Sequence, residues 1–373
     1  MAFAEAARAA FAGQLETFGL PGVGWHLERG DEVAAGASGT CRAEEGSARI
    51  GDEQKWHWGS CAKALSATVL ASLVDAGQFE QGWDSPLGSI LDSNTLPPDC
   101  DLAAVTLQQL ASHRGGVRVD LELAEEEELR KACAEMPVAE QRKAFVRKLA
   151  EKPLEHAPGK GYGYSNAGFV VLSAAAEASA KQPWEDLVVS RVTEPLGMTS
   201  FGFGSPPPGE GGAVGHNEEG EVDETGDAVW NHGCFSVHSS LSDWARFARL
   251  HLRVLRGEGD ALAALGVGPA SAQVLQMPLS PAAVGEACHG PKMPLSMAMG
   301  WQCLWEETEE GQSVPAASTG VLWHFGTNFR FNSGVYLRAD PPLLMLAGFN
   351  SGSMLARLGM RMAFEATIAA SVV

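Results

Sequence analysis

Short apolar stretches separated by turn residues lie at the two ends of the chain. Residues 23–28 and 32–36 flank the turn Arg29-Gly30-Asp31, and this pattern predicts a β-hairpin. Beyond residue 295, the stretches MAMGWQCLW, GVLWHF, SGVYLR and PLLMLAGF each predict a short strand. Because the two sets of strands stand at opposite ends of the sequence, we expect one sheet assembled from both termini.

Helical periodicity dominates the chain between these strands. In residues 61–75, Leu65, Val69 and Leu73 recur at the spacing of one helix face, and Gly77 suits the position just past a helix end. The charged segments ELAEEEELRKACAEM and VAEQRKAFVRKLAEK predict exposed helices, and AGFVVLSAAAEASAK predicts a buried one. Residues 205–233, rich in Pro, Gly and acidic residues, predict a loop, and SMLARLGMRMAFEATIAASVV predicts a C-terminal helix.

Together these patterns predict an α/β protein of the α+β kind, with an antiparallel sheet built from both chain ends, flanked by helices. A mostly helical region is inserted in the middle of the chain. We place the α/β domain at residues 1–75 plus 295–373 and the helical domain at 76–294, with the active site at their junction.

Composition and charge narrow the class of protein. The chain is 45% hydrophobic and 20% charged, as in soluble globular proteins. Its formal charge of −19 repels phosphate backbones and anionic lipids, so we expect neither nucleic acid nor membrane as a partner. The N-terminal segment lacks the basic and apolar regions of a signal peptide, and no apolar run reaches the roughly 18 residues of a membrane span. We therefore expect a cytoplasmic protein, with organellar targeting left open, and the oligomeric state is not predicted.

The cysteines argue against metal and disulfide chemistry. Seven of them are scattered along the chain with no C-x-x-C spacing. An odd, unpatterned set favours a reducing compartment and disfavours a disulfide framework or a zinc site. We expect no metal and no cofactor.

The most informative short segment is GSCAKAL at residues 59–65. Ser60 and Lys63 lie three residues apart, so both side chains share one face at the start of the predicted helix. A neutral lysine there could accept the serine proton, but its pKa would have to fall by roughly 3 units through burial and neighbouring charge. The alternative is an ordinary helix-capping serine followed by a surface lysine. The bulky residues before Ser60 and the apolar residues after it favour the catalytic interpretation.

Two further segments supply matching chemistry. In APGKGYGYSNAG, Tyr164 could relay protons and Asn166 could hold a substrate carbonyl, although the segment also suits a plain turn. In WHFGT, Gly326 on a predicted strand permits close approach of a substrate, and the N–H of Thr327 could pair with that of Ser60 as an oxyanion hole. Other hydrolase and nucleotide-binding motifs, such as G-x-S-x-G, H-E-x-x-H and the phosphate-binding loop, are missing from the sequence.

In order and spacing, these segments resemble the family of class C serine β-lactamases, D-Ala-D-Ala carboxypeptidases and related esterases and D-aminopeptidases. That family carries S-x-x-K, then Y-x-N, then K-T-G or H-x-G, which here are Ser60-Cys61-Ala62-Lys63, Tyr164-Ser165-Asn166 and His324-Phe325-Gly326. The flanking segments VTLQQLASHRGGV, EPLGMTSFGFG and CFSVHSSLSDWARFARLHL are similar to family segments too, so the resemblance runs through most of the chain.

The resemblance implies a β-lactamase/transpeptidase-like fold and a role for each matched residue. Ser60 would be the acylated nucleophile, Lys63 and Tyr164 would share the general-base work, and either could take the first proton. Asn166 and His324 would contact the substrate, and His324 could instead touch Tyr164. The N–H groups of Ser60 and Thr327, beside Gly326, would form the oxyanion hole, and Asn350 would lie near the pocket.

Two departures bear on the substrate. The lysine of K-T-G is replaced by His324 and the threonine by Phe325, so the fixed cation that would bind a carboxylate is lost at this position. We therefore expect a serine hydrolase acting on a small ester or amide, most simply a carboxylesterase-like enzyme. The alternatives are a β-lactamase, a D-amino-acid peptidase or amidase, an acyltransferase that uses the same acyl-enzyme, and a non-catalytic scaffold.

Overall fold

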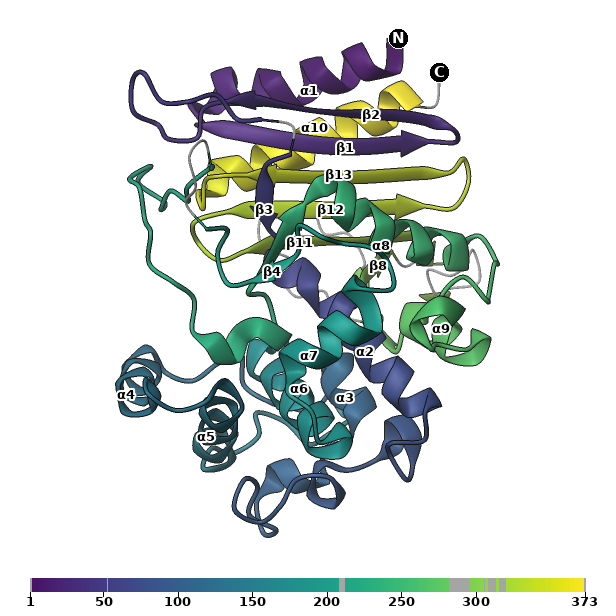
Figure 1. Ribbon diagram of the computed structural model, residues 1–373. Helices are drawn as coiled ribbons and strands as arrows, with labels where there is room; N and C mark the ends of the chain where they lie inside the picture. The colour runs from purple at the N-terminus through teal and green to yellow at the C-terminus, as the bar shows by residue number, and fades with distance from the viewer. Residues whose placement is uncertain are drawn as a thin grey trace.

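An eight-stranded antiparallel sheet, with the strand order β2-β1-β13-β12-β11-β8-β7-β6, forms the centre of the protein. The computed structural model describes residues 2–51, 53–207, 212–281, 295–304, 306–307, 313–314 and 320–371. The N-terminal hairpin lies beside the C-terminal strands, which confirms the sheet expected from both chain ends (Figure 1). The strands of this sheet are β1 (Gly22–Arg29), β2 (Glu32–Gly39), β6 (Ser280–Pro281), β7 (Leu295–Met297), β8 (Gln302–Leu304), β11 (Val321–Thr327), β12 (Asn332–Arg338) and β13 (Leu343–Phe349).

The β1–β2 hairpin joins the two chain ends. Arg29 pairs with Glu32 across the turn, and Gly30 has a φ of 58°, which the predicted Arg-Gly-Asp turn accommodates easily. On its other edge β1 pairs with β13, beginning at Val23 and Phe349. The antiparallel α/β class predicted from the sequence is thus confirmed.

Helices cover both faces of the sheet. Helices α1 and α10 pack against each other, and their apolar residues join β1, β2 and β13 in one core cluster (Figure 1). Helix α8 packs against β1, β12 and β13 although it falls within residues 76–294, which we had assigned to the helical region. The domain boundaries themselves stay a prediction. The helices are α1 (Ala2–Phe18), α2 (Ala62–Asp75), α3 (Leu107–Ala111), α4 (Leu123–Cys133), α5 (Val138–Ala150), α6 (Asn166–Ala180), α7 (Trp184–Val188), α8 (Leu241–Leu255), α9 (Pro269–Gln276) and α10 (Met354–Ser371).

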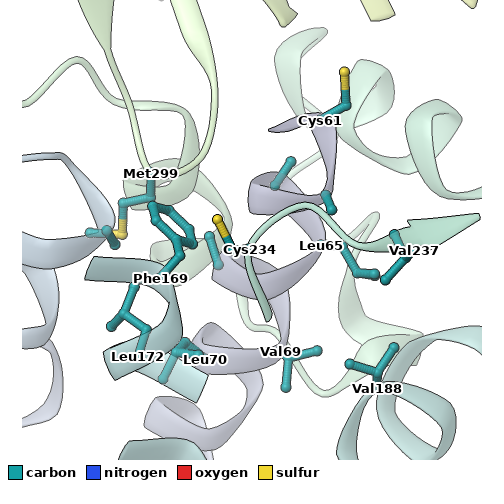
Figure 2. Packing of buried hydrophobic residues seen from close by; sticks show 14 of the residues in the cluster. Cys61, Leu65, Val69, Leu70, Phe169, Leu172, Val188, Cys234, Val237 and Met299 are labelled. Carbon is teal, nitrogen blue, oxygen red and sulfur yellow. The ribbon is translucent and has the colours of Figure 1, made fainter. Parts of the chain in front are cut away.

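Helix α2 is the central helix of the second, larger core. Every residue from Ala62 to Leu73 is buried, so α2 is covered on all sides and not only along the predicted apolar face. Figure 2 shows Leu65 and Val69 of α2 among side chains of other elements, including Phe169 of α6 and Val237 of β5. This burial places Lys63 inside the protein.

Five short strands complete the described structure. Strands β3 (Lys55–His57), β5 (Val237–Ser240) and β4 (Gly202–Phe203) form a small sheet that leads the chain into α2. Strands β9 (Glu306–Glu307) and β10 (Ser313–Val314) pair separately. The described part of residues 205–233 is mainly loop, as expected, and it also contains the short helix Val229–Gly233. Residues 208–211 lie outside the described ranges. Within those ranges, no helix is both long and apolar enough to cross a bilayer.

Candidate active site

Ser60 lies in a tight turn between the small sheet and α2. The turn is one 3₁₀ unit, Gly59–Cys61, so Ser60 directly precedes the helix cap, which is Cys61. Gly59 has a φ of 54°, a left-handed conformation that glycine adopts without strain. The Ser60 side chain is partly exposed, so a substrate can reach it, whereas Gly59 and Cys61 beside it are buried.

Lys63 is buried and faces Ser60. Its Nζ donates to Ser60 Oγ at 3.1 Å and to Asn166 Oδ1 at 2.9 Å. It also contacts the carbonyl oxygen of Cys234 at 3.4 Å and the Cys234 thiol at 3.3 Å. The lysine is therefore no surface charge, and its Nζ joins the helix of Ser60 to α6 and to the segment before β5.

The charge state of Lys63 differs from our expectation. Burial lowers the pKa of Lys63, but its electrostatic and hydrogen-bond interactions with Cys234 and Tyr164 outweigh burial and raise the pKa above its ordinary value. The sequence argument required the opposite direction. It included the effect of burial on the lysine pKa but not the effect of Cys234, which lies 171 positions further along the chain. In the resting site the ammonium form is favoured, and three N–H donors suit the surrounding oxygen acceptors.

Tyr164 lies over Lys63 and is held from behind by His113. The Lys63 Nζ is 5.1 Å from the centre of the Tyr164 ring, and the His113 ring stacks on Tyr164 at 4.3 Å. His113 also fixes the backbone on both sides, since its carbonyl accepts from Gly163 N and its Nδ1 accepts from Ser165 N, each at 3.0 Å. Burial, with the charge of Lys63 nearby, holds the pKa of His113 well below its usual value, so the imidazole is neutral.

Asn166 begins helix α6, which explains its fixed position. Ser165 caps the helix by accepting a hydrogen bond from Gly168 N at 2.8 Å. This cap holds the first helical residue, Asn166, with its side-chain oxygen toward Lys63. The expected grouping of Ser60, Lys63, Tyr164 and Asn166 is thus present in the structure.

Strand β11 closes the site against the Ser60 turn. A Cβ atom on Gly326 would lie 2.7 Å from Ser60 N and 2.3 Å from the carbonyl oxygen of Trp58. A Cβ atom on Gly59 would lie 2.4 Å from Thr327 N. Two glycines therefore allow the backbone around Ser60 N and the backbone around Thr327 N to pack closely, which is the arrangement behind the expected oxyanion hole.

His324 lies on β11 near the Tyr164 ring, with a centroid separation of 6.5 Å. Its Nδ1 is 2.7 Å from the Phe325 carbonyl oxygen, and its buried Nε2 has no hydrogen-bond partner within the described residues. Burial, then the positive charges of Lys63 and Arg357, lowers the pKa of His324 to about 3. The ring is neutral at pH 7 and supplies no fixed cation at position 324.

Asn350 does not join the group, contrary to our expectation. Its side-chain nitrogen donates to the carbonyl oxygens of Thr40 at 3.2 Å and Cys41 at 3.1 Å, and the residue is fully buried. It follows β13, two strands away from β11, and ties the end of that strand to the segment after β2. Its described side-chain bonds are structural.

Two residues at the site escaped the sequence argument. Cys234 contacts both Lys63 and Asn166, its Sγ lying 3.4 Å from the Asn166 oxygen, and burial raises its pKa to about 11. It falls just after the predicted loop, where no periodicity drew attention to it. His113 stands in the segment ASHRGG, which we used for the resemblance without assigning the histidine a role.

Solved structures with the same fold include both β-lactamases and amide hydrolases. A class C β-lactamase from Rhodobacter sphaeroides matches with a TM-score of 0.75 at 18% identity, over 99% of this chain and 100% of that chain. A D-stereospecific amidohydrolase from Streptomyces sp. matches with a TM-score of 0.69 at 18% identity, over 98% of both chains. The TM-scores establish the fold class, which is the β-lactamase/transpeptidase-like fold expected from the sequence. At 18% identity, these structures show the fold alone.

The family follows from the sequence itself. The Beta-lactamase family model matches residues 7–353, so the chain belongs to the β-lactamase family. A curated relative, penicillin-binding protein 4 of Amycolatopsis lactamdurans, is 27% identical over 202 residues, which cover 52% of this chain and 50% of the relative. The matched segment thus spans about half the length of that relative. Relatives with this fold are serine hydrolases.

Proposed function

We propose that the protein is a serine hydrolase that forms an acyl-enzyme on Ser60 and cleaves small carboxylic esters. The observation that carries this proposal is the 3.1 Å contact between Ser60 Oγ and the Nζ of the fully buried Lys63. Burying a lysine is unfavourable unless its nitrogen is well bound, and here the bound groups are those that a nucleophile needs.

The reaction begins when Ser60 Oγ attacks the ester carbonyl. The new C–O bond forms as the carbonyl π electrons move to oxygen, and the hydroxyl proton passes to the Lys63–Tyr164 pair. The N–H groups of Ser60 and Thr327 donate to the oxyanion. When the carbonyl re-forms, the alcohol leaves with the proton, and water then repeats the sequence to release the acid and restore Ser60.

The base is the pair and not one residue. With its raised pKa, Lys63 carries a proton at rest, and the Tyr164 ring lies beside it. The pair must therefore release one proton to solvent before it can accept the hydroxyl proton of Ser60. The proposed base therefore consists of two neighbouring side chains, and neither acts alone.

Labelling tests the acyl-enzyme directly. A fluorophosphonate should add the mass of one phosphonyl group to the wild-type protein and none to Ser60→Ala, with peptide mapping placing the adduct on Ser60. Unlabelled wild type would favour the non-catalytic alternative, and labelled Ser60→Ala would place the nucleophile elsewhere. Acyl transfer uses the same intermediate, so product analysis with added alcohols distinguishes transfer from hydrolysis.

The substrate preference is proposed from the chemistry at position 324. A neutral His324 offers no fixed positive charge to the carboxylate of a β-lactam, so neutral esters should react faster. We expect kcat/KM for p-nitrophenyl acetate or butyrate to exceed kcat/KM for nitrocefin. The reverse order would favour a β-lactamase.

A second candidate is hydrolysis of amides that carry a free amine, such as D-amino-acid amides. Asp120 is partly exposed and hydrogen-bonds Asn166, and burial, with the charge of Glu126, raises its pKa to about 6. Above that pH its carboxylate could bind a substrate ammonium beside Asn166. The fold neighbour that is a D-stereospecific amidohydrolase adds support.

This second candidate has its own test. A D-amino-acid p-nitroanilide should gain kcat/KM as pH rises through about 6 because Asp120 ionises, and Asp120→Asn should abolish that rise. The N-acetylated substrate serves as the control, since it has no ammonium. Equal rates on both substrates would refute amine recognition.

A further inference from the structure

Asp227 is a buried carboxylate outside the groups that react, and it has four hydrogen-bond donors. Its side chain is 3% exposed. His57 Nε2 lies 2.9 Å from Oδ2, and Ser236 Oγ donates to the same oxygen at 2.7 Å. Asn328 Nδ2 donates to Oδ1 at 3.3 Å, and Arg330 forms an ion pair with Oδ1. These donors come from three separate segments.

One of the segments carries the nucleophile. Gly59 N donates to His57 Nδ1 at 3.0 Å. Because Nδ1 accepts this bond, the ring proton is on Nε2, where it is donated to Asp227. The bonds therefore run in one direction, from the backbone just before Ser60, through the imidazole, to the carboxylate. His57 is fully buried and stacks on Phe331, so its ring cannot turn freely.

A second segment carries the other oxyanion donor. Asn328 and Arg330 belong to the β11–β12 turn, which begins immediately after Thr327. The Asn328 oxygen accepts from Phe331 N at 2.9 Å, and Thr327 Oγ1 accepts from Phe329 N at 2.9 Å, so the turn is internally braced. Fixing this turn on Asp227 also fixes the end of β11.

The third segment reaches the lysine. Ser236 lies two residues after Cys234, whose carbonyl and thiol contact Lys63 Nζ. One carboxylate thus connects the backbone before Ser60, the turn after Thr327 and the neighbour of Lys63, and none of its donors is a reacting group.

We propose that Asp227, acting through His57 on one side and through Asn328 and Arg330 on the other, is a positioning residue that sets the separation of the two oxyanion-hole nitrogens. This inference rests on the proposed acyl-enzyme function. A flexible Gly59 turn needs such support, because glycine at this point has no side chain to hold the backbone. Displacement of a catalytic group by about 1 Å can lower a rate by about 100-fold.

Two substitutions at His57 break the connection at different bonds. In His57→Gln, the amide nitrogen can replace Nε2 as a donor to Asp227, but the acceptor for Gly59 N is lost. In His57→Asn, the amide oxygen can replace Nδ1, but the bond to Asp227 is lost. The segment keeps other anchors, including Trp58 N to the Val237 carbonyl and Trp58 Nε1 to Ser239 Oγ, both at 2.9 Å, so both variants should fold.

The readout is the ratio of rates for an ester and its thionoester. Sulfur accepts N–H hydrogen bonds poorly, so this ratio measures the oxyanion hole and not general folding. We expect kcat for the ester to fall about 10- to 100-fold in both variants, with KM nearly unchanged and a smaller ester-to-thionoester ratio. Asp227→Asn should show the same pattern. Ser200→Ala is the matched control, because it removes a hydroxyl bond of 2.6 Å to a different buried carboxylate, Asp243, and should keep the wild-type ratio.

The outcomes separate this inference from the proposed function. If wild-type protein is not labelled at Ser60, the proposed function fails and the positioning role fails with it. If wild type is labelled but either folded His57 variant keeps the wild-type ratio, only the positioning role is overturned. Should Asp227→Asn fail to fold, the two His57 variants still decide the question.

Discussion

Replacing Gly326 by alanine tests the proposed oxyanion hole with a single methyl group. The new Cβ would lie 2.3 Å from the Trp58 carbonyl oxygen, 2.7 Å from Ser60 N and 2.9 Å from the Gly59 carbonyl carbon. All three atoms belong to backbone, so no side chain can rotate away. The Ser60 turn and β11 must move apart instead.

The size of the movement follows from these distances. Ordinary contact with a Cβ atom begins at 3.4 Å, so Ser60 N would have to retreat by roughly 0.7 Å and the Trp58 oxygen by roughly 1 Å. Oxyanion donors act at about 2.7–3.1 Å, and losing one lowers kcat by about 10²–10³-fold. We expect Gly326→Ala to lose about 100-fold in kcat, with a much smaller change in KM because the donors act mainly on the transition state.

The matched control is Gly334→Ala on the neighbouring strand. There the added Cβ would lie 2.5 Å from Met360 Sδ and 2.8 Å from the Phe325 ring, which are side-chain atoms that can shift. This variant should lose some thermal stability and keep most of its esterase activity. Steady-state kinetics on a p-nitrophenyl ester, with melting curves for both variants, make the comparison. A folded Gly326→Ala enzyme with more than about a tenth of wild-type kcat/KM would refute the proposed geometry.

Three further predictions use other parts of the molecule. Lys63→Arg should lose at least about 100-fold in kcat/KM, because a guanidinium stays protonated and cannot accept the Ser60 proton, and near-wild-type ester hydrolysis by the folded variant would exclude Lys63 from the base. His324→Lys should raise the nitrocefin-to-ester ratio of kcat/KM at least about tenfold by adding a cation for the carboxylate, and an unchanged ratio would contradict our substrate argument. Burial lowers the pKa of His251 to about 3, so below pH 6.5 the unfolded chain binds a proton that the folded protein does not, and stability falls as pH drops from about 6.5 toward 3. Urea unfolding should show that the free energy of unfolding falls by about 2 kcal/mol between pH 7 and pH 5 because of His251, and by less in His251→Leu. Equal stability of the wild-type protein at the two pH values would contradict this prediction.

Local signals were sufficient for much of the fold. The Arg29-Gly30-Asp31 turn and the last three C-terminal apolar stretches predicted strands that the structure contains, because a hairpin depends on residues close in sequence. The stretch MAMGWQCLW was expected as one strand, but residues 297–304 form the end of β7, a turn and β8. The all-round burial of α2 was harder to predict. Its polar residues Ser66 and Thr68 suggest an exposed face, but Thr68 donates to the Ala64 carbonyl at 2.8 Å and Ser66 to the Gly233 carbonyl at 2.7 Å. Because these hydroxyls bond to backbone carbonyls, they do not require contact with water. The hydrophobic periodicity of the sequence does not reveal such bonds.

The same limit applies to the site. Ser60, Lys63, Tyr164 and Asn166 could be grouped from the order of the motifs, and the structure brings these four side chains together. The surroundings of Lys63 could not be foreseen, since Cys234 reaches it only through the folded path of the chain. Asn350 was placed near the pocket by the family resemblance, from its position after the last strand. That position does not determine which acceptors the amide meets, and here it donates to the Thr40 carbonyl oxygen.

These surroundings also bear on the proposed proton acceptor. His113 and His324 adjoin the site, but burial holds both in the neutral form with pKa values far below neutrality, so neither is a competent base near pH 7. The Cys234 thiol, with a pKa raised to about 11, keeps its own proton there.

Lys63, which contacts Ser60, and Tyr164, whose ring lies over Lys63, are the groups that we propose to take up the Ser60 proton. A rise in rate with pH for a neutral ester should therefore report this pair. For an amine substrate, Asp120 would add a second rise near pH 6. Comparing the two profiles assigns each ionisation to its group, because only the amine substrate depends on the Asp120 carboxylate.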